Sequence, residues 1–144
     1  MKIDDVSLTM FEWAGIPSTK YGRHTGNFAG KSQLGLLTVR TDDGVEGHAF
    51  LGAASRPATL DAQSCIDQLK PILMGQDPLD RERLFRALCG RLRTTSYRAV
   101  GAADVALWDI AGKVAGLPIY KLLGAARHNI AAYASSPVLP SEAA

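Results

Sequence analysis

The chain of 144 residues is 47% hydrophobic and 21% charged, an ordinary composition for a soluble globular protein of one domain and the beginning of a second. Its net charge is only +2, and no cluster of Lys and Arg interleaves with aromatic residues, so nothing favours nucleic acid as a partner. No apolar run approaches the roughly 20 residues that span a bilayer, and the N-terminus lacks a signal-peptide core. We therefore expect no membrane partner and a cytoplasmic location.

The first third of the chain predicts strands and loops. Residues 2–13 alternate loosely between apolar and polar side chains and predict a strand. Residues 14–32 are rich in Gly, Ser, Thr and Asn and predict a long loop, of a kind that is usually a functional lid or disordered. Residues 34–41 and 45–51 are β-rich runs joined by Asp-Asp-Gly, which predicts a hairpin. Residues 52–58 predict a second, shorter loop.

Two helices are predicted next. Apolar residues at helical spacing indicate a first helix that ends at Gly75; they are Ala62, Ile66, Leu69 and Leu73. Pro71 lies inside this stripe and should shorten or kink the last turn. Asp77 and Pro78 are a good N-cap and first-turn pair for a second helix over residues 78–92. The core face of that helix would be Leu84 or Phe85 with Leu88 and Leu92.

Residues 99–124 are the stretch around which the rest of the chain is organised. An amphipathic helix is predicted by apolar residues at helical spacing, which are Val100, Ala103, Leu107, Ile110 and Val114. Gly116 and Pro118 should end it. Its many small residues would let a neighbouring element approach closely. Asp109 and Lys113 are four residues apart with the acid first, the favourable order for a helical ion pair.

The last predicted element is an apolar run over residues 129–135, typical of a strand buried on both faces. The predicted order is thus three strands, three helices and a lone strand. A three-stranded antiparallel meander against a helical layer is a sound α+β unit. The last strand has no partner in this order.

The stretch over residues 99–124 resembles the characteristic segment of the mandelate racemase/muconate lactonizing branch of the enolase superfamily. The matching positions are small residues followed by Asp104, Ala106, Leu107, Asp109, Gly112, Lys113, Pro118, Ile119 and the Leu-Leu-Gly of residues 122–124. The departure is Ala103, where the family prefers a larger aliphatic residue. The resemblance implies an enolase-like N-terminal capping domain over residues 1–126 and the start of a (β/α)₈ barrel over residues 127–144. Because such a barrel takes about 250 residues, we expect the chain to be a fragment or a truncated product.

The resemblance also implies a reaction. Enzymes of this superfamily remove the proton α to a carboxylate, with Mg²⁺ stabilising the resulting enediolate. The small-molecule carboxylate would be the substrate of a 2-hydroxy acid racemase or an acid-sugar dehydratase, and the full-length enzyme is expected to be a homo-oligomer. The family's metal ligands and catalytic base belong to the barrel, so we assign neither here. Asp104 and Asp109 lie about 140° apart around a helix and cannot converge on one ion.

What this chain would contribute is the lid over the barrel mouth, formed in the family by loops that correspond to residues 14–32 and 52–58. Five side chains are candidate substrate-binding groups, namely Tyr21, Arg23, His24, Asn27 and Ser135. An arginine fork suits a carboxylate, and the polar set favours a polyhydroxylated acid. The alternative is that the loop residues are merely solvated, and that Ser135 and Ser136 serve the turn before Pro137.

The other titratable residues fit structural roles. Cys65 and Cys89 lack metal-type spacing and are expected to be free thiols. His48 should form a surface pair with Glu46 or a hydrogen bond in the core, and His128 lies in a basic turn. Three arginines near the helix junction indicate a solvated basic face or one that pairs with acids of a partner subunit; they are Arg91, Arg93 and Arg98.

Two other functions remain open. The chain could be a non-catalytic capping or interaction module, or a remnant, although an unpaired apolar strand at residues 129–135 would then favour aggregation. Nucleotide binding through Gly22, Gly26 and Gly30 is disfavoured, because no helix follows them to offer its N-terminus to a phosphate.

Overall fold

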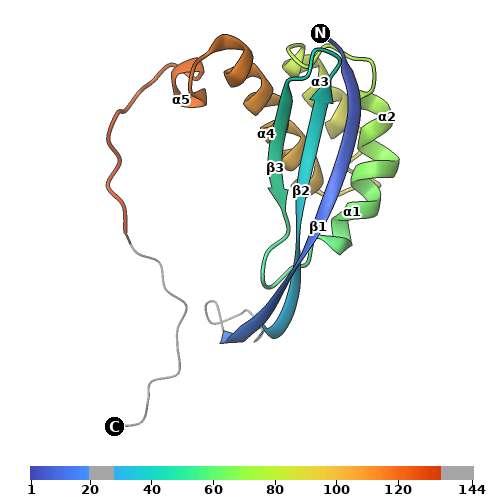
Figure 1. The fold of residues 1–144 in the computed structure, drawn as a ribbon, viewed down its shortest axis with the longest axis vertical. Helices are drawn as coiled ribbons and strands as arrows, with labels where there is room; N and C mark the ends of the chain where they lie inside the picture. Colours follow the sequence, from blue (N-terminus) through green and yellow to red (C-terminus); the bar gives the residue numbers. More distant parts are fainter. Residues whose placement is uncertain (20–27, 134–144) are drawn as a thin grey trace.

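A computed structural model describes residues 1–19 and 28–133 of the chain. It contains a three-stranded antiparallel sheet in the order β1 (Ile3–Thr19), β2 (Phe28–Thr41) and β3 (Glu46–Leu51), with helices covering one face (Figure 1). The predicted α+β class and the meander are therefore confirmed.

The first predicted loop is shorter than the sequence suggested. Residues 14–19 continue β1 and residues 28–32 begin β2, so much of the stretch expected to be loop is a strand ribbon. Backbone hydrogen bonds between β1 and β2 hold this stretch as strand despite its polar composition. The pairing register shifts between Trp13 and Ile16 and again between Ile16 and Thr19. Because β3 ends opposite Gly35, the ribbon of β1 and β2 projects beyond the helix-covered body (Figure 1).

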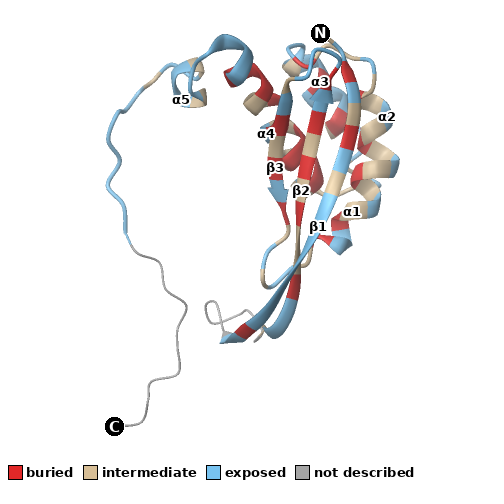
Figure 2. Ribbon diagram, viewed as in Figure 1, coloured by how far each residue is buried: buried red, intermediate tan, exposed pale blue. Residues whose placement is uncertain are grey.

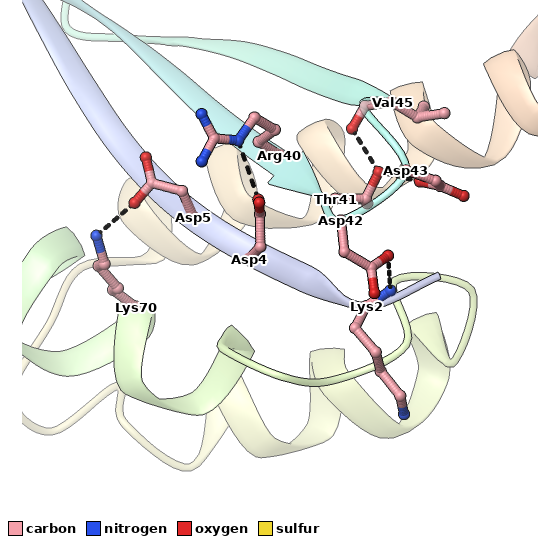
Figure 3. A network of polar contacts seen from close by, with 9 residues as sticks. All are labelled: Lys2, Asp4, Asp5, Arg40, Thr41, Asp42, Asp43, Val45 and Lys70. Carbon is pink, nitrogen blue, oxygen red and sulfur yellow. Dashed lines mark hydrogen bonds and ion pairs between the residues drawn. The ribbon is translucent and has the colours of Figure 1, made fainter.

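The turn between β2 and β3 forms as predicted. Gly44 has φ +85°, and the backbone N–H of Thr41 donates to the carbonyl of Val45 at 3.0 Å. The Thr41 hydroxyl also contacts Asp43 and Val45 (Figure 3). At the same end of the sheet, Lys70 on the helical layer donates to Asp5 of β1 at 2.7 Å, and this hydrogen bond lowers the pKa of Asp5 (Figure 3). The sheet and the helices are thus joined where the chain begins.

The first predicted helix is a continuous run of α1 (Thr59–Ser64), a π-helical turn η1 (Cys65–Leu69) and α2 (Lys70–Leu73). Pro71 has no N–H to donate, and the helix accommodates it by widening into the π-helical turn that precedes it. The last turn is not shortened, and the helix still ends before Gly75. The wider turn places the core face on Asp61, Cys65, Leu69 and Leu73. The expected Ala62 and Ile66 are only half-buried.

The second predicted helix is shorter than expected. It is α3 (Arg81–Cys89) rather than residues 78–92. The Asp77 carboxylate accepts a hydrogen bond from the backbone N–H of Leu79, so it stabilises a separate turn and is not the helix cap. Leu84 and Leu88 form its buried face, whereas Phe85 is exposed.

The organising stretch is α4 (Tyr97–Ala115) followed by the short α5 (Ile119–Leu122). Ser96 caps α4 by accepting from the N–H of Ala99, and Gly116 ends it in the left-handed region with φ +63°. Its core face matches the prediction except at Val114, which is exposed. In the described part of the chain, every helix is too short or too polar to cross a bilayer.

The predicted final strand is not seen. Residues 129–133 pair with no strand, and Ile130 and Tyr133 are exposed. No edge among the described strands lies beside this segment, so its backbone has nothing to pair with (Figure 1). Residues 134 and 135 lie outside the described part.

The core lies between the sheet and the helices, where the buried residues of both layers face one another (Figure 2). The sheet contributes Val6, Leu37, Val39, Ala49 and Leu51, and α4 contributes Val100, Ala103, Ala106, Leu107 and Ile110. β3 lies close against α4 at Gly47, where an added Cβ would lie 2.0 Å from the carbonyl oxygen of Ala106. The expectation that small residues on this helix permit close approach is confirmed.

We expect the Cys65 thiol to react at least about tenfold more slowly than that of Cys89 with a maleimide near pH 8. Cys65 is buried, and burial together with the charge of Asp61 raises its pKa to about 11, so little thiolate is present. Cys89 is only half-buried. Mass spectrometry after timed labelling, with Cys65→Ser and Cys89→Ser variants to assign the products, measures both rates. Equal rates in the folded protein would contradict the prediction.

Candidate functional site

The predicted substrate-binding residues lie outside the described residues; they are Tyr21, Arg23, His24, Asn27 and Ser135. The structure does describe the frame that carries most of them. Thr19 and Phe28 pair at the ends of β1 and β2, and residues 20–27 join these two strand ends. The first candidate lid loop is therefore carried on a two-stranded ribbon.

An open recess lies between this ribbon and the second candidate lid, residues 52–58. It is lined by residues of both elements and by the first residue of α1, namely Glu12, Lys31, Ser32, Gln33, Pro57 and Thr59. Lys31 Nζ donates to Glu12 Oε1 at 2.8 Å, and this hydrogen bond raises the pKa of Lys31. Both side chains are exposed, so the pair contributes little stability and Lys31 is free to turn to another anion. Lys31 was not among the predicted binding residues, although it lies in the 14–32 stretch that was expected to form the first lid.

The second candidate lid is a closed turn fastened to β2. Ala53 and Arg56 exchange two backbone hydrogen bonds of 2.8 and 3.1 Å. The Ser32 hydroxyl donates to the carbonyl of Ala53 at 2.7 Å, and the N–H of Ala58 donates to the carbonyl of Gln33 at 2.8 Å. The turn therefore has a defined shape and lies against one wall of the recess.

A buried carboxylate lies behind this turn. Asp61, in the first turn of α1, is 2% exposed. Its Oδ2 atom lies 3.5 Å from Arg98 Nε and accepts no hydrogen bond among the described residues, and its Oδ1 atom lies 4.0 Å from Arg56 Nη2. Arg98 Nη2 also donates to the carbonyl of Arg56 at 3.2 Å. Of the three arginines predicted to form a basic cluster, Arg98 is therefore paired with an acid of its own chain.

The burial of Asp61 is predictable from the sequence. The helix that contains it has Ala58, Cys65 and Leu69 at helical spacing from Asp61, so the acid lies within an apolar stripe. A buried acid at such a position requires a cationic partner. The partner, Arg98, is far away in sequence, and no local pattern identifies it.

Two charged residues of the 99–124 stretch, Asp109 and Lys113, form hydrogen bonds with the open edge of β3. The Asp109 carboxylate accepts a hydrogen bond from the backbone N–H of His48 at 2.9 Å. Lys113 Nζ donates to the carbonyl of Glu46 at 2.7 Å and to Asp109 at 2.8 Å, which confirms the predicted ion pair. The two side chains therefore bind the strand edge as a neighbouring strand would.

The described residues offer no metal centre. Within residues 1–19 and 28–133, no group of three or more His, Cys, Asp or Glu side chains is placed to hold an ion. Asp109 is already committed to the edge of β3, and His48 lies 3.2 Å from the Thr38 hydroxyl and 3.6 Å from Glu46. His128 contacts the ring of Tyr120 edge-on. A magnesium ion would need ligands from outside the described residues.

Comparison with known proteins gives one family and many relatives. Residues 20–124 match the family described as mandelate racemase/muconate lactonizing enzyme, N-terminal domain. The chain is 36% identical over 119 residues to the cis-3-hydroxy-L-proline dehydratase of Roseibium aggregatum, covering 79% of this chain and 32% of that protein. It is 44% identical over 104 residues to a D-galactonate dehydratase family member of Streptomyces sp. (strain SPB074), covering 67% of this chain and 24% of that protein.

Solved structures give the same result. D-glucarate dehydratase from Agrobacterium tumefaciens, complexed with magnesium, superposes with a TM-score of 0.66 at 32% identity, over 86% of this chain and 33% of that one. N-succinyl Arg/Lys racemase from Bacillus cereus superposes with a TM-score of 0.72 at 23% identity, over 86% of this chain and 34% of that one, and so shares the fold. This chain spans about a third or less of the length of these relatives.

Proposed function

Since the chain belongs to the mandelate racemase/muconate lactonizing enzyme family of the enolase superfamily, we propose that it is the capping domain of a Mg²⁺-dependent enzyme that removes the proton α to a carboxylate. Residues 1–126 would form this domain and residues 127–144 would begin the barrel. The observation that carries the proposal is the family match over residues 20–124, which includes the second candidate lid and all of α4.

An acid-sugar dehydratase is the form of this activity that we favour over a racemase. Several of the similar proteins are dehydratases of sugar acids by name. In such a reaction the α proton is removed, the hydroxyl on the next carbon leaves as water, and the enol product becomes a 2-keto acid. Bound Mg²⁺ would supply positive charge to the developing oxyanion.

The role we propose for this chain is to recognise the substrate and to exclude water. Lys31 lines the recess and Arg56 belongs to the turn that borders it, so both could meet an anionic substrate. The pKa of Lys31 is raised by its hydrogen bond with Glu12, so this side chain keeps its positive charge at neutral pH. The candidate groups of the first lid, Tyr21, Arg23, His24 and Asn27, would add donors for a polyol chain, and Ser135 would lie at the end of the first barrel strand.

We also propose that the full protein is a homo-oligomer. The sheet face opposite the helices carries large exposed apolar side chains, namely Phe11 and Trp13 of β1 and Phe50 of β3. Apolar groups gathered on one uncovered face favour contact with another protein surface.

The experiment is to isolate the protein from its source, determine its intact mass, and incubate it with Mg²⁺ and a panel of acid sugars in D₂O. We expect a mass more than twice the 15.4 kDa of this sequence, together with Mg²⁺-dependent loss of the α proton and formation of a 2-keto acid. A mass near 15.4 kDa without exchange would overturn the proposal in favour of a non-catalytic capping or interaction module. A large protein that exchanges no α proton in any acid of the panel would overturn it as well.

A further inference from the structure

A buried ion pair lies where the second candidate lid meets the helical layer. Asp61 is almost fully buried. Its Oδ2 atom accepts no hydrogen bond among the described residues and lies 3.5 Å from Arg98 Nε. A carboxylate in such a place is costly unless a cation compensates it. Arg98, at the start of α4, is therefore constrained to keep its guanidinium beside Asp61.

The same guanidinium reaches the lid. While Nε faces Asp61, Nη2 donates to the backbone carbonyl of Arg56 at 3.2 Å. That carbonyl is also the acceptor of the Ala53 N–H, which closes the turn at 2.8 Å. Because the guanidinium is a rigid planar fork, fixing one nitrogen fixes the direction of the others. The position of the lid is thus tied to a buried charge in the core.

We propose that Asp61 and Arg98 are positioning residues that hold the 52–58 turn in one conformation and thereby fix the backbone from which the Arg56 side chain projects. Arg56 is the only cationic residue of this turn, and its side chain is 54% exposed, so it is available to an anionic group of the substrate. Its own contact with Asp61 is long, at 4.0 Å, and contributes little against solvent. Arg98, and not Arg56, therefore joins the buried carboxylate to the turn.

A merely structural role makes a different prediction. If Asp61 and Arg98 only compensated each other's charge, any cation at position 98 would serve and the turn would keep its shape. If Arg98 positions the turn, the charge alone is insufficient, because the hydrogen bond to the Arg56 carbonyl needs a second donor at a fixed angle. Lysine keeps the charge but lacks the fork.

The test is amide hydrogen exchange, measured by NMR, on the chain and its Arg98→Lys and Arg98→Gln variants. In Arg98→Lys we expect the amides of Ala53, Arg56 and Ala58 to exchange about fivefold to tenfold faster, while amides of the β2–β3 ladder keep their rates. In Arg98→Gln, Asp61 loses its charge partner, so we expect faster exchange in the turn and throughout the core. The double variant Arg98→Gln with Asp61→Asn also removes the buried charge. In this double variant we expect the core amides to return to the exchange rates of the parent chain, while the turn amides still exchange faster.

Arg40→Gln is the matched control, because it removes an arginine from an exposed ion pair with Asp4 at the opposite end of the sheet (Figure 3). It should leave the turn unchanged. In Arg98→Lys, either unchanged exchange of the turn amides or equal acceleration of the turn and core amides would overturn the inference. The inference rests on the proposed function only where it describes the turn as a substrate lid. Exchange rates report the turn itself, so a failure here is distinct from the absence of dehydratase activity.

Discussion

Replacement of Gly47 by alanine is expected to lower the free energy of unfolding by about 3 kcal/mol, the upper part of the usual range for overpacking a core. The added methyl group would lie 2.0 Å from the carbonyl oxygen of Ala106 and 2.7 Å from Ile110 Cγ1. Both distances are well inside van der Waals contact, so β3 and α4 must separate.

The backbone contact makes this cost difficult to relieve. The Ile110 side chain could adopt another rotamer, but the Ala106 carbonyl belongs to the hydrogen-bonded backbone of α4. Moving α4 away would also strain the contacts that Asp109 and Lys113 make with the edge of β3. Ile110→Ala removes the contacting Cγ1 atom but leaves the Ala106 carbonyl in place, so we expect the double variant Gly47→Ala with Ile110→Ala to be no more stable than Gly47→Ala alone.

Gly101→Ala is the matched control, since it makes the same change in α4 where nothing lies within 4 Å of the new methyl group. Alanine favours a helix interior over glycine by up to about 1 kcal/mol, so this variant should be slightly more stable than the parent chain. Urea unfolding followed by circular dichroism gives both free energies. Equal midpoints for Gly47→Ala and the parent chain would show that β3 and α4 are not packed as described.

Local patterns were sufficient where one stretch of sequence determines the structure. The turn at Gly44, the end of α4 at Gly116 and the ion pair of Asp109 with Lys113 were all predicted, because each depends on residues at most four positions apart. The small residues of α4 also predicted close approach by another element. The element itself, β3 at Gly47, could not be identified, because the contact spans almost sixty residues.

The errors have the same origin. Gly, Ser, Thr and Asn indicated a loop over residues 14–32, but strand pairing between β1 and β2 overrode composition over much of that stretch. The π-helical turn before Pro71 moved the core face from Ala62 to Asp61. Within the candidate site, Arg98 was expected on a solvated basic face or beside acids of a partner subunit. It instead lies beside Asp61 and donates to the carbonyl of Arg56, and both of these are distant in sequence.

Replacement of Asp109 by alanine is expected to lower the free energy of unfolding by about 2 kcal/mol, the usual cost of removing a charged acceptor from a hydrogen-bonded donor. The N–H of His48 would lose its acceptor, and Lys113 would lose its ion pair. Asp109→Asn keeps an oxygen for the His48 N–H but no charge for Lys113, so its cost should be about half as large. Urea unfolding at neutral pH measures both variants.

The pH dependence of the Asp109→Asn cost identifies the charge as its source. Burial acts to raise the pKa of Asp109, but the hydrogen bonds from Lys113 and from the His48 N–H outweigh it, so the pKa lies below its ordinary value. A carboxylate with a lowered pKa stabilises the folded state above its unfolded pKa of about 3.9 and loses that contribution as the pH falls through the folded value. The parent chain should therefore exceed Asp109→Asn in stability most at pH 7, and the difference should shrink as the pH falls below about 4. A difference that is the same at both pH values would mean that amide geometry, and not the charge that joins α4 to the edge of β3, accounts for the loss.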